Sequence, residues 1–136
     1  MSPSSEPASL ARKCIDLFNR HSLEWVDTCY AKDVDWNELP LPTSPNGHHG
    51  DRALLRESAA RVLSIFPDRG MSVERIVAEG DCVAMELVWM GTASATIGPL
   101  QKGTQLQYRI ASFLTIRDGL ITRQIDYCVP LRSSNP

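Results

Sequence analysis

Asp126 is the residue of this 136-residue chain whose position most suggests chemistry. It lies inside an apolar, β-rich run, residues 120–129, where aspartate has a low strand propensity and its charged form is costly to desolvate. A carboxyl group in an apolar cavity has a raised pKa, which suits a group that exchanges protons near neutral pH. The alternative is an aspartate on the exposed face of the strand, paired with Arg109 or Arg123.

The turn before this strand decides which face Asp126 occupies. If Asp118-Gly119 is a two-residue turn, Asp126 faces Ala111 and lies near Arg109, which favours the salt bridge. If the loop has three residues, Asp126 faces Ile110, and the arginines lie on the opposite face of the sheet. We expect the three-residue loop, because it separates the charged residues from the apolar face.

A second carboxyl group, Glu38, lies on the same side of a short strand as Trp36. A carboxyl group beside an aromatic ring can hold water or substrate, whereas the alternative is a solvated strand end. His48 and His49 come next, in a Pro- and Gly-rich loop over residues 40–50 that could close over a pocket. Adjacent histidines in such a loop are more often exposed than catalytic, so their role stays open.

Composition and missing motifs argue against several classes of function. The chain has 14 Lys+Arg against 16 Asp+Glu, without the clustered basic excess that nucleic-acid binding needs. No uncharged apolar run approaches the roughly 18 residues of a membrane span. The sequence also lacks the glycine-rich nucleotide loops, the H-E-x-x-H zinc motif and the G-x-S-x-G nucleophile motif. We therefore expect no nucleic-acid partner, no membrane association, no metal and no organic cofactor.

The four cysteines, Cys14, Cys29, Cys82 and Cys128, are widely spaced and form no C-x-x-C pair. Each lies among apolar residues, so we expect buried, reduced thiols rather than disulfides or zinc ligands. Residues 1–7 have neither the basic cluster nor the apolar stretch of a secretory signal. A cytoplasmic location is therefore the expected one.

Local patterns divide the chain into helices followed by a run of strands. Apolar residues at helical spacing predict helices over residues 9–19, 23–30 and 52–66, with Ser22 and Asp51 as N-caps and Pro67 as a stop. β-rich runs predict strands over residues 34–39, 71–78, 82–95, 105–116 and 120–129. We expect one domain over residues 8–130, flanked by flexible tails at 1–7 and 131–136.

Helices in the first half and antiparallel strands afterwards are typical of an α+β fold, with helices on one face of a sheet. One long strand carries apolar side chains on both faces: Met85, Leu87 and Trp89 on one, and Ala84, Val88 and Met90 on the other. Three helices can cover one face, so a second subunit is the best cover for the other. We therefore expect a homodimer.

Several short motifs, in their order along the chain, resemble those of a known family. They are Pro40-Leu41-Pro42, Gly50-Asp51-Arg52, Phe66-Pro67, Glu79-Gly80-Asp81, Arg117-Asp118-Gly119 and Ile125-Asp126-Tyr127. Over residues 8–130 the pattern resembles the SnoaL-like polyketide cyclase branch of the nuclear-transport-factor-2-like superfamily. This resemblance implies a cone-shaped, cystatin-like fold, in which three N-terminal helices and a curved, mostly antiparallel sheet enclose a deep apolar cavity, usually in a dimer. It also implies acid/base catalysis without a cofactor, with Asp126 as the proton-transfer group.

The first strand, with its Pro-Leu-Pro end, and Asp126-Tyr127 are also similar to the limonene-epoxide hydrolases of the same superfamily. In those enzymes a Tyr and an Asn on the first strand, together with the Asp on the last strand, hold the attacking water. Here Trp36 and Glu38 replace that Tyr and Asn, and Leu87 and Trp89 stand where the hydrolases have an Arg-x-Asp pair. An epoxide-opening mechanism would therefore lack the partner that protonates the epoxide oxygen.

The sequence thus predicts a small dimeric enzyme that acts on an apolar, oxygen-bearing metabolite, polyketide-like or terpenoid, by cyclisation or isomerisation. Asp126 would transfer the proton, and Glu38 would hold water or act as a second carboxyl group. The residues expected to line the substrate cavity are Trp36, His48, Leu87, Trp89, Tyr108 and Ile110. Epoxide opening by water or an internal hydroxyl is the second hypothesis, and a non-catalytic ligand-binding module is the third.

Overall fold

The computed structural model describes residues 6–42 and 44–134. The helices of this part of the chain are α1 (Glu6–Phe18), α2 (Glu24–Cys29) and α3 (Arg52–Ile65). Its strands are β1 (Tyr30–Glu38), β2 (His48–Gly50), β3 (Gly70–Glu79), β4 (Cys82–Thr92), β5 (Gln105–Arg117) and β6 (Leu120–Ser134). The predicted α+β class is confirmed.

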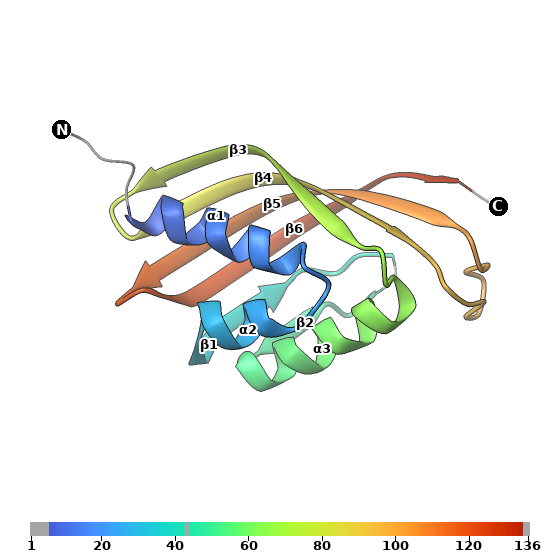
Figure 1. The fold of residues 1–136 in the computed structure, drawn as a ribbon, viewed down its shortest axis with the longest axis horizontal. Coiled ribbons are helices and arrows are strands. Elements are labelled where there is room, and N and C mark those ends of the chain that lie inside the picture. Colours follow the sequence, from blue (N-terminus) through green and yellow to red (C-terminus); the bar gives the residue numbers. More distant parts are fainter. Residues whose placement is uncertain (1–5, 43, 135–136) are drawn as a thin grey trace.

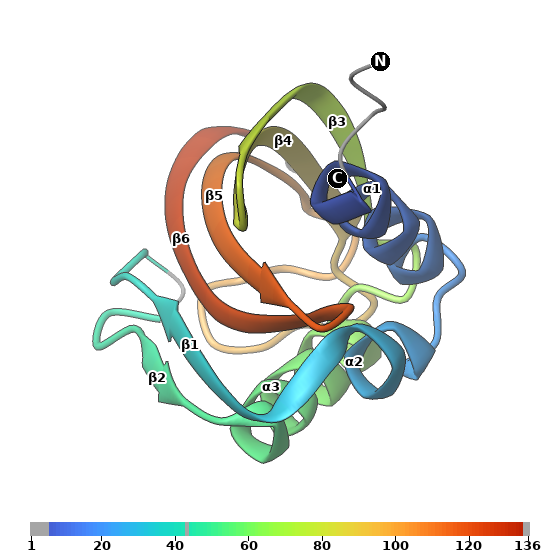
Figure 2. The same cartoon turned by 90° about the vertical axis from the view of Figure 1, so that its left-hand side faces the viewer.

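Within the described residues, the strands form one six-stranded sheet in the order β2-β1-β6-β5-β4-β3. β1 and β6 pair in parallel, whereas the other neighbours pair antiparallel. The sheet bends into an arch, and the helices lie on its concave side (Figure 1, Figure 2). The core and the candidate site therefore lie between the arch and the helices.

Local signals set both ends of α3. The Asp51 side chain accepts a hydrogen bond from the Leu54 N–H at 3.2 Å, so it caps the helix as predicted. At the other end Phe66 leaves the helical conformation, and Pro67 follows it. These signals act over a few residues, which is why the sequence shows them directly.

The prediction of a second helix that reaches Tyr30 is wrong at its C-terminal end. Tyr30 has an extended backbone, with φ −110° and ψ 137°, and begins β1 opposite Ile121 of β6. At the start of α2, Ser22 Oγ accepts a hydrogen bond from the Glu24 N–H at 3.3 Å, but Leu23 occupies the N-cap position. Pairing between distant strands thus takes precedence over the helical spacing of the apolar residues.

The segment predicted as a loop over residues 40–50 ends in the short strand β2, which pairs with the end of β1. The chain turns back at Gly47, where φ is 64°. Glycine fits this position because a Cβ atom would collide with the Glu38 carbonyl oxygen. β1 and β2 separate α3 from α1 and α2, so the helices do not form one continuous N-terminal block. Three residues are too few to show strand alternation, which is why the sequence gives no sign of β2.

The last strand is longer than predicted. β6 continues to Ser134, past residue 131, the predicted start of the C-terminal tail. At the other end α1 already begins at Glu6. The other residues predicted as tails, 1–5 and 135–136, lie outside the described part of the chain.

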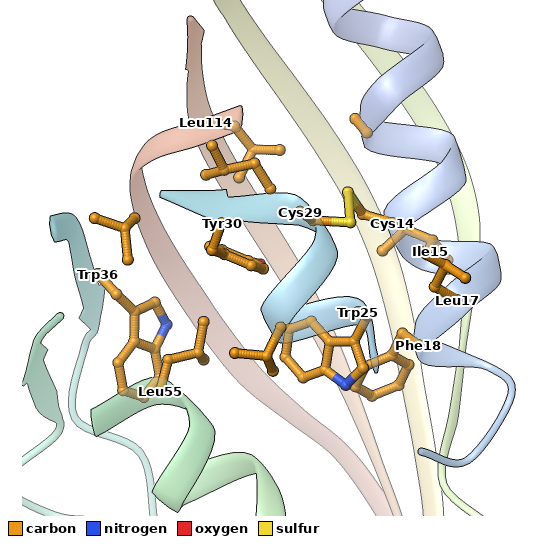
Figure 3. Close-up of a cluster of buried hydrophobic side chains, with 14 of the residues drawn as sticks. Cys14, Ile15, Leu17, Phe18, Trp25, Cys29, Tyr30, Trp36, Leu55 and Leu114 are labelled. Carbon is orange, nitrogen blue, oxygen red and sulfur yellow. A yellow bond between two sulfur atoms is a disulfide. The ribbon is translucent and has the colours of Figure 1, made fainter. Parts of the chain in front are cut away.

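Aromatic rings and a disulfide join the first two helices to the core. The ring centroids of Phe18 and Trp25 are 5.2 Å apart, and those of Trp25 and Tyr30 are 5.7 Å apart, in edge-to-face arrangements (Figure 3). A disulfide links Cys14 of α1 to Cys29 of α2, with the two Cα atoms 6.1 Å apart. The prediction of reduced thiols is wrong for this pair, because the packing of α1 on α2 brings together cysteines that are far apart in sequence.

The other two cysteines are free thiols, as predicted. Cys82, at the start of β4, is exposed rather than buried, because it lies at the turn that joins β3 to β4. Cys128 is partly buried, and burial raises the pKa of its thiol, with a smaller effect from the charge of Asp126. Neither thiol therefore replaces Asp126 as the acid/base candidate.

The convex face of the sheet carries apolar side chains that the single chain leaves exposed. They are Val77, Met90, Phe113, Tyr127 and Val129. On the concave face, Met85, Leu87 and Trp89 of β4 line the interior instead. The prediction that the long strands are apolar on both faces is confirmed, and a second subunit over the convex face stays a prediction.

Candidate active site

Four polar residues form one row across the sheet. His48 of β2 pairs with Glu38 of β1, Glu38 pairs with Asp126 of β6, and Asp126 pairs with Ser112 of β5. Directly paired residues point to the same face of a sheet. Glu38, Asp126 and Ser112 line one cavity on the helix side, so this row faces the interior. The parallel pairing of β1 with β6 is what brings the two predicted carboxyl groups side by side.

Asp126 lies on the predicted face of the sheet, but the turn between β5 and β6 differs from the predicted one. Asp118-Gly119 is the two-residue turn, with φ of 52° and 77°, so the predicted three-residue loop is wrong. A β-bulge beside Thr122 then shifts the pairing by one residue. Asp126 therefore pairs with Ser112 and with neither of the two predicted partners, Ala111 and Ile110.

The arginines that might have paired with Asp126 lie on the opposite face. Arg109 Nη1 is 3.4 Å from Glu86 Oε2, and Arg123 Nε is 4.0 Å from Asp35 Oδ2. The predicted separation of Asp126 from these charges is confirmed, and the salt-bridge alternative is wrong.

Asp126 is held by side-chain donors. Ser112 Oγ donates to Asp126 Oδ1 at 2.6 Å, and Gln124 Nε2 donates to Oδ1 at 3.1 Å and to Oδ2 at 2.9 Å. The Tyr30 hydroxyl donates to Gln124 Oε1 at 2.6 Å, which turns the amide nitrogen of Gln124 toward Asp126. The carboxyl group is therefore fixed in orientation before any ligand binds.

Burial is the main cause of the unusual acidity of Asp126. Burial and, to a smaller extent, the nearby charge of Glu38 raise the pKa of this carboxyl group, which is about 6 once all contributions are included. Hydrogen bonds from Ser112, Gln124 and Trp36 act in the opposite direction, because they favour the charged form. Burial and the charge of Asp126 also raise the pKa of the Tyr30 hydroxyl, so that hydroxyl stays protonated and remains a donor. Asp126 can thus gain or lose a proton near neutral pH.

Glu38 and His48 form a second polar pair at the end of the same row. His48 Nδ1 lies 3.1 Å from Glu38 Oε1, and the two side chains are 19% and 25% exposed. The imidazole ring stacks on Trp36, with centroids 5.6 Å apart and planes 16° apart. The solvated strand end is therefore the wrong alternative for Glu38, and His48 has an inward position.

His49 takes the opposite position from its neighbour. Its Nε2 lies 2.7 Å from Asp35 Oδ1, and both side chains are more than half exposed. The alternation of β2 sends one histidine inward and the other outward. From the sequence alone, the roles of both histidines were open.

The interior contains two adjacent chambers. An inner chamber of about 140 Å³ reaches Asp126, and an outer chamber of about 200 Å³ reaches His48. The residues that line both are Glu38, Ser58, Val62, Trp89 and Ile110. The two chambers therefore lie side by side and share part of their walls, and the surface of each is mostly apolar.

The residues predicted to line a substrate cavity occupy the walls of these chambers. Trp36 and Leu87 line the inner chamber, His48 and Tyr108 the outer, and Trp89 and Ile110 both. Their contact with a substrate stays a prediction.

Sequence reasoning gave no role to Gln124 and placed Tyr30 in a helix. The position of Gln124, two residues before Asp126 on the same strand face, was the available signal for that residue. No comparable local signal links Tyr30 to Asp126, because their contact depends on the pairing of β1 with β6.

Comparison with known proteins identifies the family of this cavity-forming fold. A family profile described as a SnoaL-like domain matches residues 11–124. The chain belongs to the SnoaL-like family. The predicted resemblance to the SnoaL branch of the nuclear-transport-factor-2-like superfamily is therefore confirmed. A search among curated proteins finds no match for the chain.

Solved structures share the SnoaL-like fold at low sequence identity. IdmH from Streptomyces antibioticus, a candidate polyketide cyclase, is 24% identical, with a TM-score of 0.78, over 91% of this chain and 92% of IdmH. A SnoaL-like polyketide cyclase from Agrobacterium tumefaciens is 17% identical, with a TM-score of 0.70, over 90% and 91% of the two chains. A protein from Catenulispora acidiphila with a ketosteroid isomerase-like fold is 18% identical, with a TM-score of 0.70, over 87% and 83%. At these identities the likeness shows the fold alone.

Two further features of this SnoaL-like chain bear on the predicted partners. Across residues 6–42 and 44–134, no helix is both long and apolar enough to cross a membrane. In the same residues, His, Cys, Asp and Glu side chains form no group of three or more that could hold a metal ion.

Proposed function

We propose that this SnoaL-like protein is a cofactor-free acid/base enzyme that cyclises or isomerises a small, apolar, oxygen-bearing metabolite, polyketide-like or terpenoid. The observation that carries the proposal is the Asp126 carboxyl group, which lies in the wall of an apolar cavity with a pKa of about 6. The names of the structural neighbours, polyketide cyclase and ketosteroid isomerase-like fold, support the same class of reaction.

At neutral pH the Asp126 carboxyl group is mostly ionised and therefore accepts a proton. Its poor hydration makes it a stronger base than an exposed aspartate, strong enough to act on a carbon next to a carbonyl group. Returning the proton to another atom of the same molecule gives isomerisation. Attack of the resulting carbanion on a second carbonyl group gives cyclisation. The alkoxide formed by cyclisation takes up a proton in place of the one held by Asp126, so in either case Asp126 ends as a carboxylate.

The surrounding side chains have distinct proposed roles. Ser112 and Gln124 hold the carboxylate by hydrogen bonds, so its lone pairs keep a fixed direction. Trp36, Leu87, Trp89, Tyr108 and Ile110 form the apolar walls that would hold the carbon skeleton of the substrate. Glu38 supplies a second carboxyl group next to the first.

Epoxide opening has weaker support. The similar epoxide hydrolases have an Arg-x-Asp pair that protonates the epoxide oxygen, but the matching positions here are Leu87 and Trp89 of β4. We therefore do not propose epoxide opening as a second function, and leave it to be tested by experiment.

The experiment uses 2-tetralone, an apolar bicyclic ketone with acidic C–H groups, because it needs no knowledge of the natural substrate. The protein should accelerate the exchange of these protons for deuterium in D2O, as followed by proton NMR. Asp126→Asn should lower the enzymatic rate by about two to four orders of magnitude, since it removes the base and keeps the shape. Asp33→Asn, at an exposed site on β1, is the matched control and should keep the wild-type rate.

Two results would contradict the proposal. Equal exchange rates for wild type and Asp126→Asn would show that Asp126 is not the base. Binding of 2-tetralone without any acceleration of exchange would favour the non-catalytic binding module. A correctly folded Asp126→Asn protein is verified by its circular dichroism and its melting temperature.

We also propose that the protein is a homodimer that buries the convex face of the sheet. The face combines the exposed Phe113, Tyr127 and Val129 with the charges of Glu86 and Arg109. A patch with both signs of charge and apolar groups can complement itself across a two-fold axis. Sedimentation equilibrium should give the mass of two chains for wild type and of one chain for Val129→Lys. A monomeric wild-type protein would contradict this part of the proposal.

A further inference from the structure

We propose that His48, oriented by Glu38, is a second proton-transfer group of the cavity, so that the reaction is a ring closure with protons moving at two separate sites. The inference rests on the proposed function, since it takes Asp126 as the base. It goes further because it names a second group, the atom that acts and the kind of substrate.

The first step of the argument is the orientation of the imidazole. Glu38, as a carboxylate, only accepts hydrogen bonds, so the Nδ1 of His48 facing its Oε1 must carry a proton. The stack on Trp36 fixes the plane of the ring. In the described residues no protein atom is hydrogen-bonded to Nε2 of His48, so this nitrogen is the one available to a ligand. A carboxylate behind Nδ1 and a free Nε2 is the arrangement that histidine uses in proton transfer.

The second step is the distance between the two groups. Glu38 is the direct pairing partner of both His48 and Asp126, so one strand separates the two proton-transfer sites. Two strand spacings put the backbones of β2 and β6 about 10 Å apart. His48 lines the outer chamber, Asp126 lines the inner one, and Glu38 lines both. A ligand that reaches both groups must therefore lie along Glu38, which borders the two chambers.

The third step is the chemistry that such a ligand allows. A shift of a double bond between neighbouring carbons is served by one carboxylate, because the proton leaves and returns close by. An intramolecular aldol closure needs a base at one carbon and an acid at the oxygen of the second carbonyl group. Two separate groups, Asp126 and His48, supply what the second case needs. The substrate class is a flexible, mostly apolar molecule with at least two carbonyl groups.

The proton movements balance over one turnover. The Asp126 carboxylate takes a proton from the carbon next to one carbonyl group, and the C–H electron pair becomes the nucleophile. That carbon forms a bond to the second carbonyl carbon, whose C=O π electrons move onto oxygen. Protonated His48 gives its Nε2 proton to this alkoxide. Asp126 is then protonated and His48 is neutral, so one proton must return from Asp126 to His48, and Glu38 lies between them in the row.

Ring closure of 2-(3-oxobutyl)cyclohexanone tests this inference against the exchange of 2-tetralone. The first probe is a diketone that closes to a bicyclic aldol product, and the second needs only the base. We expect His48→Gln to lower the closure rate at least tenfold more than it lowers the exchange rate. His49→Gln removes the neighbouring, outward-facing histidine and should leave both rates at the wild-type level.

The outcomes separate failure of the inference from failure of the proposed function. If Asp126 is required for exchange but His48→Gln lowers closure and exchange equally, the second site is wrong and the proposed function stands. If wild type accelerates neither exchange nor closure, the proposed function fails, and this inference fails with it.

A second measurement does not depend on turnover. Nitrogen NMR of the histidine rings should show that neutral His48 carries its proton on Nδ1. Glu38→Leu should move His48 toward the ring-nitrogen signature of the exposed His21, because the acceptor is lost. A wild-type His48 with its proton on Nε2 would overturn the inference whatever the rates show.

Discussion

The inner chamber is lined by a charged side chain from each of two regions of the fold, and the surroundings of the two side chains differ. Asp126 of β6 is met by the side chains of Ser112 and Gln124. Arg69, just before β3, is 1% exposed and is met by main-chain carbonyl groups. Its Nη1 donates to the Phe18 oxygen at 2.5 Å and its Nη2 to the Ser22 oxygen at 3.4 Å, at the end of α1. The guanidinium also lies 3.7 Å from the centre of the Phe18 ring.

The difference shows which of the two charges can change during a reaction. Burial raises the pKa of Asp126 to about 6, close enough to neutrality for the group to exchange protons. Burial lowers the pKa of Arg69 to about 10, so the guanidinium remains charged at neutral pH. Arg69 supplies donors to the Phe18 carbonyl group at the C-terminus of α1, where a cation is favourable, and to the Ser22 carbonyl group just beyond it. We therefore assign Arg69 to the fold and Asp126 to the chemistry.

Arg69→Met should produce the largest loss of stability and so tests the structural half of the comparison. It removes the guanidinium donors from the Phe18 and Ser22 carbonyl groups, so that Phe18 keeps only the 3.3 Å hydrogen bond from the His21 N–H, and we expect a loss of about 2–4 kcal/mol in the free energy of unfolding. Urea denaturation measures this change. Arg56→Met, which removes an exposed ion pair with Asp27, is the control and should cost less than about 1 kcal/mol. Equal losses in the two variants would show that Arg69 is not a structural anchor.

The pH dependence of stability tests the other half. The pKa of Asp126 is higher in the folded protein than its ordinary value of 3.8, so the folded state binds this proton more tightly. The stabilisation is complete below pH 3.8 and is lost as the pH rises through about 6. Asn does not titrate, so the stability of wild type relative to Asp126→Asn should fall by about 1–3 kcal/mol between pH 4 and pH 7.

Urea denaturation at several pH values measures this difference, and Asp33→Asn is the exposed control. A difference between wild type and Asp126→Asn that does not vary with pH would contradict the raised pKa. A difference that grows in the opposite direction would mean that the folded protein favours the ionised form of Asp126.

Those parts of the fold that depend on local residues could be predicted from the sequence. Asp51 and Pro67 mark the ends of α3, and alternation locates the strands from β3 to β6 to within a few residues, apart from the C-terminal end of β6. The unpredicted features depend on contacts between distant segments. Tyr30 joins β1 because β6 lies beside it, β2 exists only through its pairing with β1, and the disulfide needs α1 packed on α2.

In the candidate site, too, the features set by local residues could be predicted and those set by distant contacts could not. The face of Asp126 could be predicted, because alternation along a strand and the separation of charges are visible in the sequence. Its pairing with Ser112 could not be predicted, because the bulge at Thr122 has no local signature. The inward position of His48 depends on β2, so the sequence could not distinguish it from His49.

Ser112→Ala should produce the smallest effect, and it uses the feature that distinguishes Asp126 from Arg69. The donors to Asp126 are side chains, so one of them can be deleted, whereas the main-chain acceptors of Arg69 cannot. The Ser112 hydroxyl favours the charged carboxylate, so its loss should raise the pKa of Asp126 above about 6, by about one unit or less.

Carbon NMR of the Asp126 carboxyl group measures this shift, and the low-pH limb of the 2-tetralone exchange rate should move to higher pH with it. Ser58→Ala, in the wall of both chambers, is the control and should leave the titration in place. A lowered or unchanged pKa in Ser112→Ala would mean that the hydroxyl does not stabilise the ion, and the contrast between an adjustable carboxylate and a fixed guanidinium would lose its basis.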